Sequence, residues 1–178
     1  FDDGLQDSFL NYDISFVCFN NTNWVGNGCL IPSGPLREKL TSISKYDAIF
    51  LTGNEENTSD IKNSINKINK DIKIFDSYYK PINVHKFNIQ DNYLMFSGIG
   101  NPDSFKKTLQ KNKFKIVEEI KFPDHYQYTT KDIQMIKLRA ININAKIITT
   151  EKDFVKISQS DSNKIDFLEI DLVIKKQD

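Results

Sequence analysis

The segment from Phe122 to Thr129 contains the residues whose types best suit acid–base chemistry. It reads Phe-Pro-Asp-His-Tyr-Gln-Tyr-Thr and places Asp124 beside His125, one of two histidines in the chain. Histidine has an unperturbed pKa near neutrality, so it can accept or release a proton at physiological pH. A proline-bounded loop whose histidine only satisfies a backbone group would have the same sequence, because one histidine is a weak motif.

Two adjacent carboxylates near the start of the chain form a second candidate site. Asp2 and Asp3 precede Gly4. If a buried strand ended there, both side chains would lie at the carboxyl edge of a sheet, where open α/β sheets bind ligands. Paired carboxylates suit Mg²⁺, which takes one or two of them together with water and phosphate oxygens. An ordinary Asp-Asp-Gly turn is the alternative.

The stretch from Trp24 to Glu38 is a candidate ligand-facing loop. Its three glycines and two prolines indicate an irregular backbone, in which Gly26 and Gly28 are free to take positive φ. It does not match the G-x-x-x-x-G-K-[ST] phosphate loop, and no other segment of the chain matches it either. A long surface loop without a ligand is the alternative interpretation.

A second glycine-rich turn occurs at Ser97-Gly-Ile-Gly-Asn-Pro102, directly after a strand-like run. Asn101 and Pro102 match a helix N-cap followed by proline at the first helical position. A glycine-rich strand end that leads into a helix can hold an anion, because free N–H groups and the helix dipole point outward there. A tight turn that only packs against neighbouring residues would have the same sequence pattern.

Alternating strand and helix patterns must position these residues. Strands are expected at 13–19, 47–52, 71–79, 93–100, 114–120, 146–150 and 166–174, and helices at 58–70, after Asn101, from Thr129 and from Thr150. Residues 81–87 are expected to be an extended connection. This alternation predicts an α/β fold of parallel βαβ units in two lobes, with residues 1–86 as an N-terminal lobe and linker and residues 87–178 as a C-terminal α/β lobe.

Composition excludes several functions. The chain has 178 residues and equal numbers of cationic and acidic side chains, 24 each, so it lacks the positive excess of a general nucleic-acid binder. No window approaches the roughly 18 apolar residues of a membrane-spanning helix. Cys18 and Cys29 are too few for a disulfide framework or a metal quartet. Phe1 resembles the end of a buried strand, so we expect a fragment whose upstream part is missing.

Taken together, five segments resemble the tetraacyldisaccharide 4'-kinase family, the lipid A 4'-kinases of Gram-negative bacteria. They occur in the family's order and are Asp2–Gln6, Gly26–Glu38, Ser97–Pro102, Phe122–His125 with Tyr128–Thr129, and Thr149–Asp153. The resemblance implies a P-loop kinase, with the first lobe a remnant of the kinase fold. It implies transfer of the γ-phosphoryl group of ATP to the 4'-hydroxyl of an acylated glucosamine disaccharide 1-phosphate.

The resemblance also implies roles for individual residues. Asp2 and Asp3 would serve the Mg²⁺–ATP site, and His125 would help an upstream aspartate to deprotonate the acceptor. Asp124 could orient the loop, although neighbours in an extended chain point to opposite sides. Further substrate-binding or structural loop positions are Gly26, Asn27, Gly28, Arg37, Gly98, Gly100 and Asn101. The implied partners are the acylated lipid and the cytoplasmic face of the bacterial inner membrane.

The chain departs from the family pattern at several points. Leu5 and Asp7 replace an aromatic residue and a histidine of the Asp-Asp-Gly motif. The phosphate loop, the upstream aspartate and the membrane-associating N-terminal helix are absent, so this chain alone is expected to be inactive. A non-catalytic sugar- or nucleotide-binding α/β domain is the alternative. A third hypothesis is a glycosyltransferase-like protein that uses Asp2 and Asp3 as metal ligands.

Overall fold

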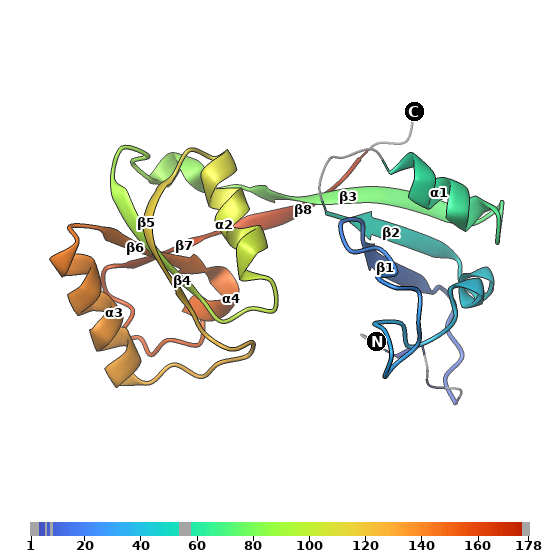
Figure 1. Cartoon of the computed structure of the whole chain (residues 1–178), viewed down its shortest axis with the longest axis horizontal. Helices are drawn as coiled ribbons and strands as arrows, with labels where there is room; N and C mark the ends of the chain where they lie inside the picture. The colour runs from blue at the N-terminus through green and yellow to red at the C-terminus, as the bar shows by residue number, and fades with distance from the viewer. Residues whose placement is uncertain (1–3, 6, 8, 54–57, 176–178) are drawn as a thin grey trace. The chain divides into compact units, whose positions relative to one another are not determined.

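The computed structural model describes residues 4, 5, 7, 9–53 and 58–175 (Figure 1). The chain divides into two compact units, one formed by Phe1–Tyr79 with Leu172–Asp178 and the other by Lys80–Asp171. The sequence had suggested a division between residues 86 and 87. It gave no indication that the last strand returns to the first unit.

The first unit is a four-stranded sheet in the order β1-β2-β3-β8. Strands β1, β2 and β3 pair in parallel. The elements are β1 (Phe16–Asn20), η1 (Leu40–Lys45), β2 (Ala48–Thr52), α1 (Ser59–Asn66), β3 (Lys73–Pro81) and β8 (Ile170–Ile174). Ile49 and Leu51 of β2 pack against Ile65 of α1, so the core of this unit lies on one face of the sheet.

The opposite face of that sheet has an aromatic row. The rings of Phe16 and Phe50 lie 5.4 Å apart, and those of Phe50 and Phe75 lie 5.3 Å apart. Phe16 remains exposed. Parallel sheets usually have both faces covered. This face of the first unit is therefore an apolar surface formed by side chains of three neighbouring strands.

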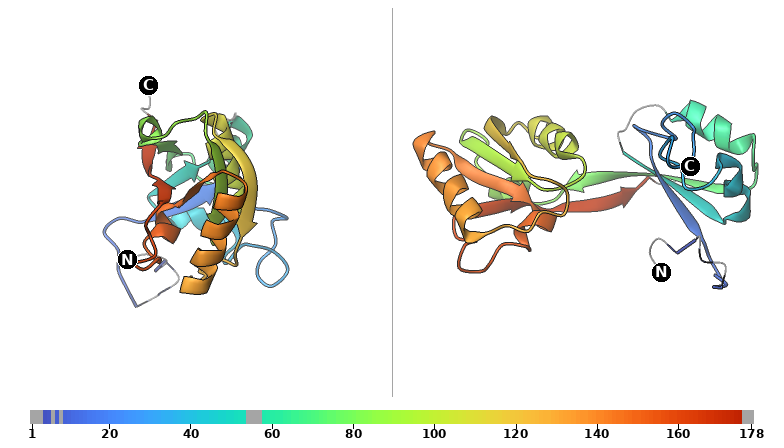
Figure 2. Two further views of the ribbon diagram at one scale, coloured as in Figure 1. Left: turned by 90° about the vertical axis from the view of Figure 1, so that its left-hand side faces the viewer. Right: turned by 60° about the horizontal axis from the view of Figure 1, so that its bottom comes forward.

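The second unit is a parallel four-stranded sheet in the order β5-β4-β6-β7 (Figure 2). Its elements are η2 (Val84–Lys86), β4 (Asn92–Ser97), α2 (Pro102–Lys111), β5 (Lys115–Lys121), α3 (Thr130–Asn142), β6 (Lys146–Thr150), α4 (Glu151–Phe154) and β7 (Ile165–Leu168). Tyr93 and Met95 of β4 pack on the α2 side, whereas Leu94 and Phe96 pack on the α3 side. Both faces of this central strand are thus buried, which confirms the predicted parallel α/β architecture.

The helices of the second unit begin where their capping sequences predict. The Asn101 side chain accepts a hydrogen bond from Ser104 N at 3.0 Å, and Pro102 opens α2. Thr129 and Asp132 form a reciprocal capping box at the start of α3. Capping satisfies backbone N–H groups that lack a partner in the first turn. These local signals fixed the starts of both helices.

Two sequence predictions were wrong. Residues 166–174 form two strands in different sheets, β7 and β8, which meet at Glu169. The buried Asn83 binds the backbone at this break: its side chain accepts a hydrogen bond from Glu169 N at 3.0 Å and donates one to Phe167 O at 2.9 Å. The expected extended connection also contains a 3-10 helix, η2. Strand β3 leads from the first unit into the second, and β8 leads back.

Among the described residues, no helix has both the length and the apolar character needed to cross a bilayer.

Replacing Ile136 by alanine tests the core of the second unit. Ile136 is fully buried, so Ile136→Ala should lower the free energy of unfolding by about 2–5 kcal/mol. Ile141 lies on the same helix but is 72% exposed, and Ile141→Ala should change it by no more than about 0.5 kcal/mol. Urea unfolding monitored by circular dichroism measures both. Equal effects of the two substitutions would contradict the assigned packing of α3.

Candidate functional site

The strand order of the second unit reverses at the carboxyl edge of its sheet. The chain passes from β4 to β5 on one side and then continues to β6 on the other side of β4. In open α/β sheets, ligands bind at such a reversal, outside the carboxyl ends of the strands. The turn that follows β4 begins at Gly98, and β6 ends at Thr150, which caps α4. The candidate residues of this unit lie around these two strand ends.

The loop 122–129 rests on the turn after β4. His125 N donates to Gly98 O at 3.2 Å. A Cβ at Gly98 would lie 3.0 Å from Tyr128 Oη and 3.1 Å from Pro123 O. A Cβ at Gly100 would lie 3.1 Å from an Asp124 carboxylate oxygen. These close approaches explain the two glycines by packing against the loop.

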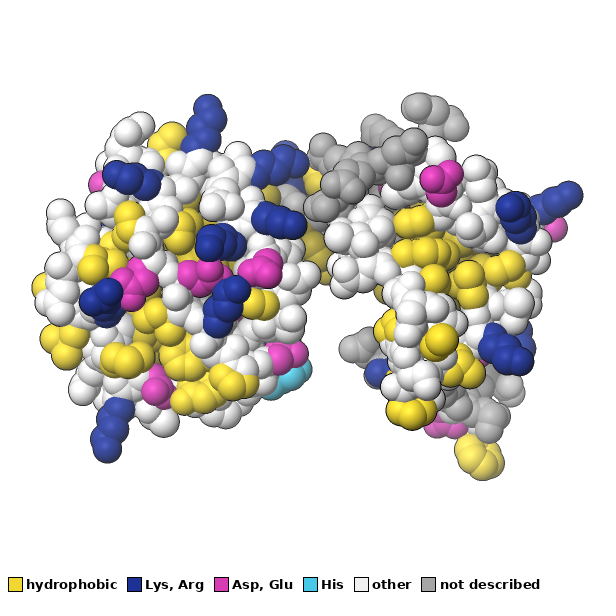
Figure 3. Space-filling view, viewed as in Figure 1, with side chains coloured by type: hydrophobic (Ala, Val, Ile, Leu, Met, Phe, Trp, Pro, Cys, Tyr) yellow, Lys and Arg dark blue, Asp and Glu magenta, His cyan; other side chains and the backbone are white. Residues whose placement is uncertain are grey.

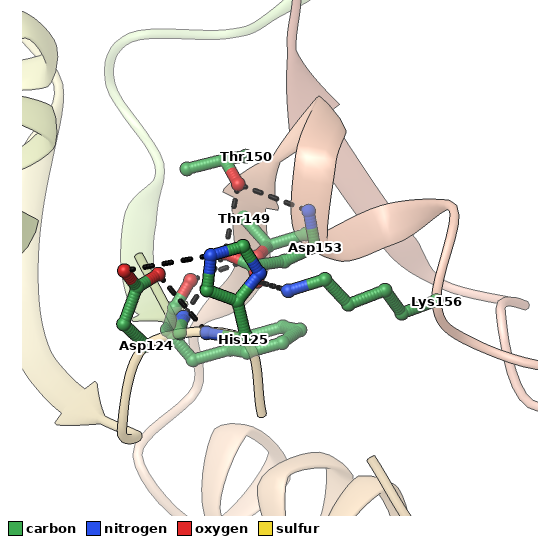
Figure 4. Close-up of polar contacts among 8 residues, drawn as sticks. Asp124, His125, Thr149, Thr150, Asp153 and Lys156 are labelled. Atoms are coloured by element: carbon green, nitrogen blue, oxygen red, sulfur yellow. Dashed lines mark hydrogen bonds and ion pairs between the residues drawn. The ribbon is translucent and has the colours of Figure 1, made fainter. Parts of the chain in front are cut away.

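Asp124 and His125 lie together at the tip of this loop (Figure 4). Asp124 Oδ1 accepts a hydrogen bond from His125 N at 2.9 Å, and Asp124 Oδ2 lies 3.8 Å from His125 Nε2. The second distance is too long for a hydrogen bond but permits an ion pair once the imidazole is protonated. The imidazole is 75% exposed, so it can reach a ligand.

The backbone of His125 explains why the two side chains meet. An extended chain would have placed them on opposite sides. His125 instead has a φ of 59°, in the left-handed region, so the chain turns at this residue. Non-glycine residues adopt this conformation uncommonly, and such residues cluster at functional sites. The sequence did not predict this turn.

The buried carboxylate of Asp153 supports the loop through Gly98. Asp153 is fully buried, and its Oδ2 accepts hydrogen bonds from Gly98 N at 3.0 Å and Thr150 Oγ1 at 2.7 Å. Lys156 Nζ donates to Asp153 Oδ1 at 3.0 Å. Asp153 therefore fixes Gly98, whose carbonyl in turn holds His125 N. The sequence predicted the helix cap at Thr150 but not the hydrogen bond between Asp153 and Gly98. Lys156, three residues after Asp153, was a signal that the two side chains could pair.

Aromatic side chains anchor the rest of the loop. The Tyr128 ring packs against Phe96 at 5.4 Å, Phe122 at 5.1 Å and Tyr126 at 5.4 Å between ring centroids. Burial, followed by the negative charge of Asp153, raises the pKa of Tyr128 far above its ordinary value. The Tyr128 hydroxyl thus keeps its proton at neutral pH. Tyr126 donates to Asp132 Oδ2 at 3.2 Å, which ties the loop to the capping box of α3.

In the first unit, the predicted loop is held together by its own side chains. Gly26 and Gly28 have φ values of 58° and 74°, as their sequence context predicted. Asn27 Oδ1 accepts a hydrogen bond from Cys29 N at 3.0 Å, and Asn27 Nδ2 donates to Ser33 O at 2.8 Å. These contacts assign Asn27 a structural role within the loop.

Arg37 lines a cavity of about 290 Å³ in the first unit, together with Glu38 and residues of β1. Asp2 and Asp3 lie outside the described residues, so their predicted metal site is not tested. In the part of the chain that the structure describes, no group of three or more His, Cys, Asp or Glu side chains could hold a metal ion.

Fold and site together define an α/β protein with parallel sheets and a histidine-bearing loop over the strand reversal of its second sheet. A family model described as LpxK, tetraacyldisaccharide-1-P 4'-kinase, matches residues 1–178. The chain belongs to this family, which confirms the resemblance found in the sequence motifs.

Individual relatives agree with the family match. The tetraacyldisaccharide 4'-kinase of Pelagibacter ubique is 48% identical over 177 residues, which are 99% of this chain and 56% of the relative. That of Rickettsia bellii is 41% identical over 161 residues, 89% of this chain and 48% of the relative. The chain therefore spans about half the length of the curated relatives it matches.

One solved structure, LpxK from Aquifex aeolicus in complex with ATP, has a similar fold. The TM-score is 0.63 at 20% sequence identity, and the match covers 98% of this chain and 52% of that protein. At this identity the likeness concerns the fold alone.

Removing the Lys156 cation, which pairs with Asp153, should destabilise the folded chain. In Lys156→Met the buried Asp153 carboxylate loses its counter-charge, so the free energy of unfolding should fall by about 3–5 kcal/mol. Lys152 lies on α4, the short helix that contains Asp153, and is exposed, so Lys152→Met should have an effect within about 0.5 kcal/mol. Urea titration of both variants measures the difference. Similar midpoints for the two variants would refute a supporting role for the Asp153–Lys156 pair.

The raised pKa of Tyr128 predicts a pH dependence of stability. The pKa of Tyr128 in the folded state lies above its ordinary value of 10.0. The contribution of the protonated Tyr128 hydroxyl to the free energy of unfolding is therefore complete below pH 10.0 and is lost as pH rises above it. The free energy of unfolding should therefore fall in alkali, and Tyr128→Phe should make this fall smaller. Tyr79 is exposed, so Tyr79→Phe serves as the control. An unchanged alkaline slope in Tyr128→Phe would contradict the prediction.

Proposed function

We propose that this chain contributes the acceptor-side residues of an ATP-dependent kinase that phosphorylates the 4'-hydroxyl of a tetraacyldisaccharide 1-phosphate in lipid A biosynthesis. The observation that carries the proposal is the family match along residues 1–178, supported by relatives named tetraacyldisaccharide 4'-kinase. Because the chain spans about half of these relatives, the activity is proposed for a protein that also contains the other half.

In this proposal His125 accepts the proton of the acceptor hydroxyl. Phosphoryl transfer depends on positioning and charge stabilisation, and it needs a group that takes the proton of the attacking hydroxyl. The imidazole is 75% exposed, so an acceptor hydroxyl can approach it, and Asp124 Oδ2 lies 3.8 Å from its Nε2. Asp124 and Gly98 act as positioning residues, because both bind the backbone N–H of His125.

The described residues offer no cluster of side chains for a metal ion. The sequence contains no G-x-x-x-x-G-K-[ST] loop. We therefore assign Mg²⁺ only to Asp2 and Asp3, and we derive no catalytic step through the metal. Gly26, Asn27, Gly28 and Arg37 are proposed to form a substrate-facing loop of the first unit, and Gly100 and Asn101 a loop of the second.

The proposed acceptor carries acyl chains, so the partner of this kinase is a lipid bilayer surface. The proposed location is the cytoplasmic face of the bacterial inner membrane, where the protein would bind peripherally. No nucleic-acid partner is proposed, because cationic and acidic side chains are equal in number.

A non-catalytic sugar- or nucleotide-binding domain is the second candidate function. It would need only the glycine-rich turn between β4 and α2, where a strand end leads into a capped helix N-terminus. In that case the residues at the carboxyl ends of β4 and β6 would bind a ligand without transferring a phosphoryl group.

A chimeric enzyme tests the proposal. This chain replaces the matching part of the Pelagibacter ubique relative, and transfer of labelled phosphate from ATP to the disaccharide is measured. We expect turnover, and His125→Ala should lower kcat by about 10²–10⁴-fold with little change in the KM for ATP. A folded chimera that binds the acceptor but transfers no phosphate would favour the binding-domain alternative.

The other histidine provides a matched control. His85 is exposed in η2, and His85→Ala should leave kcat unchanged. His125→Gln repeats the test with a side chain closer in size to imidazole. Full turnover in both His125 variants would refute the assigned proton acceptor.

A further inference from the structure

Helix α3 has two apolar faces. Its inner face packs Ile133, Ile136 and Ala140 into the core of the second unit. Its outer side exposes Met135, Leu138 and Ile141, with 49%, 62% and 72% of each residue accessible. A surface helix ordinarily presents polar side chains to water. Hydrophobic side chains gather over α3 in the lower left of Figure 3.

Cations surround the exposed side chains. A hollow of about 430 Å³ is lined by Met135 and Leu138, and one of about 600 Å³ includes Ile141 in its wall. Five cationic residues and one carboxylate line these two hollows. The cations are Lys131, Lys137, Arg139, Lys146 and Lys164, and the carboxylate is Asp166.

Three of these cations have no ionic partner among the described residues. They are Lys131, Lys137 and Lys164, whereas Arg139 pairs with Glu118 at 2.8 Å and Lys146 pairs with Asp91 at 2.7 Å. The whole chain has a formal net charge of zero. The positive charge around α3 is therefore a local excess, and it surrounds an apolar strip.

We propose that this surface docks on an anionic lipid bilayer. The α3 outer surface consists of Met135, Leu138 and Ile141 with Lys131, Lys137 and Lys164. A basic amphipathic helix binds a membrane by placing its apolar side chains at the boundary between headgroups and acyl chains, while its lysines contact anionic headgroups. The exposed side chains of α3 meet both requirements.

Docking through α3 also fits the position of the candidate site. Thr129 caps α3 four residues after His125, so the loop lies at the N-terminal end of the docking helix. This part of the argument rests on the proposed function, in which the acceptor is an acylated lipid. A bilayer on the α3 outer surface would lie against the helix that begins where the loop ends, with Lys131 in its first turn.

Other occupants fit the α3 outer surface less well. In a symmetric dimer the same patch would face itself, so the unpaired lysines would be brought together and repel. A nucleic acid would match the positive charge but would leave Met135, Leu138 and Ile141 without apolar partners. An anionic bilayer satisfies the lysines and the apolar side chains together.

Vesicle co-sedimentation of this chain tests the proposal. The two vesicle preparations are phosphatidylcholine alone and phosphatidylcholine mixed with phosphatidylglycerol. We expect binding to the mixed vesicles that weakens with salt, and little binding to phosphatidylcholine alone. The double variants Leu138→Gln/Ile141→Gln and Lys137→Gln/Lys164→Gln should each reduce partitioning on the order of tenfold.

Matched control variants replace exposed apolar and cationic side chains elsewhere in the second unit. Val155 is 74% exposed and lines neither hollow, so Val155→Gln should bind as the unchanged chain does. Lys107 and Lys111 lie exposed on α2, so Lys107→Gln/Lys111→Gln removes equal charge from another helix. Equal binding by the surface variants and these controls would overturn the proposal. A dimer that only the α3 variants dissociate, without vesicle binding, would also overturn it.

Vesicle binding and kinase activity can fail separately. The sedimentation assay needs neither ATP nor turnover. A chain that binds vesicles through α3, in a chimera that transfers no phosphate, would refute the proposed function and leave the docking surface intact. An active chimera whose constituent chain does not bind vesicles would refute the docking surface and leave the proposed function intact.

Discussion

The carboxylate of Asp153 is shut off from solvent, yet it accepts hydrogen bonds from Gly98 N, Thr150 Oγ1 and Lys156 Nζ. A buried charge is tolerated only when it is paired and its lone pairs are satisfied, so this group needs all three donors in place. Gly98 directly follows β4, and Thr150 is the last residue of the neighbouring strand β6. One side chain therefore joins two strand ends at the carboxyl edge of the second sheet.

The loop with His125 takes its conformation from that junction. Gly98 binds Asp153 through its N–H and His125 through its carbonyl, so the backbone of His125 is held although the imidazole remains in solvent. The aromatic group around Tyr128 packs against the same turn. A fixed backbone beneath a free side chain suits a residue that must meet a ligand, since positioning can supply much of a catalytic effect.

Predictions from sequence succeeded where the signal was local. Asn101, Thr129 and Thr150 cap helices through residues three positions away, and the strands of the second sheet follow from short apolar runs. The ordered motifs also identified the family. The bond between Asp153 and Gly98 joins residues 55 positions apart, and no periodicity reports such a contact. The break at Glu169 and the turn at His125 were missed for the same reason, because distant atoms impose both.

The path of the chain through the two units has a consequence for biosynthesis. The second unit is continuous from Lys80 to Asp171, whereas the first unit takes up β8 only after it. Every strand of the second unit is thus synthesised before β8, the strand that covers the edge of β3 in the first sheet. Exposed edges promote association between nascent chains. Strand β8 blocks association at the β3 edge, but only after the whole second unit has been synthesised.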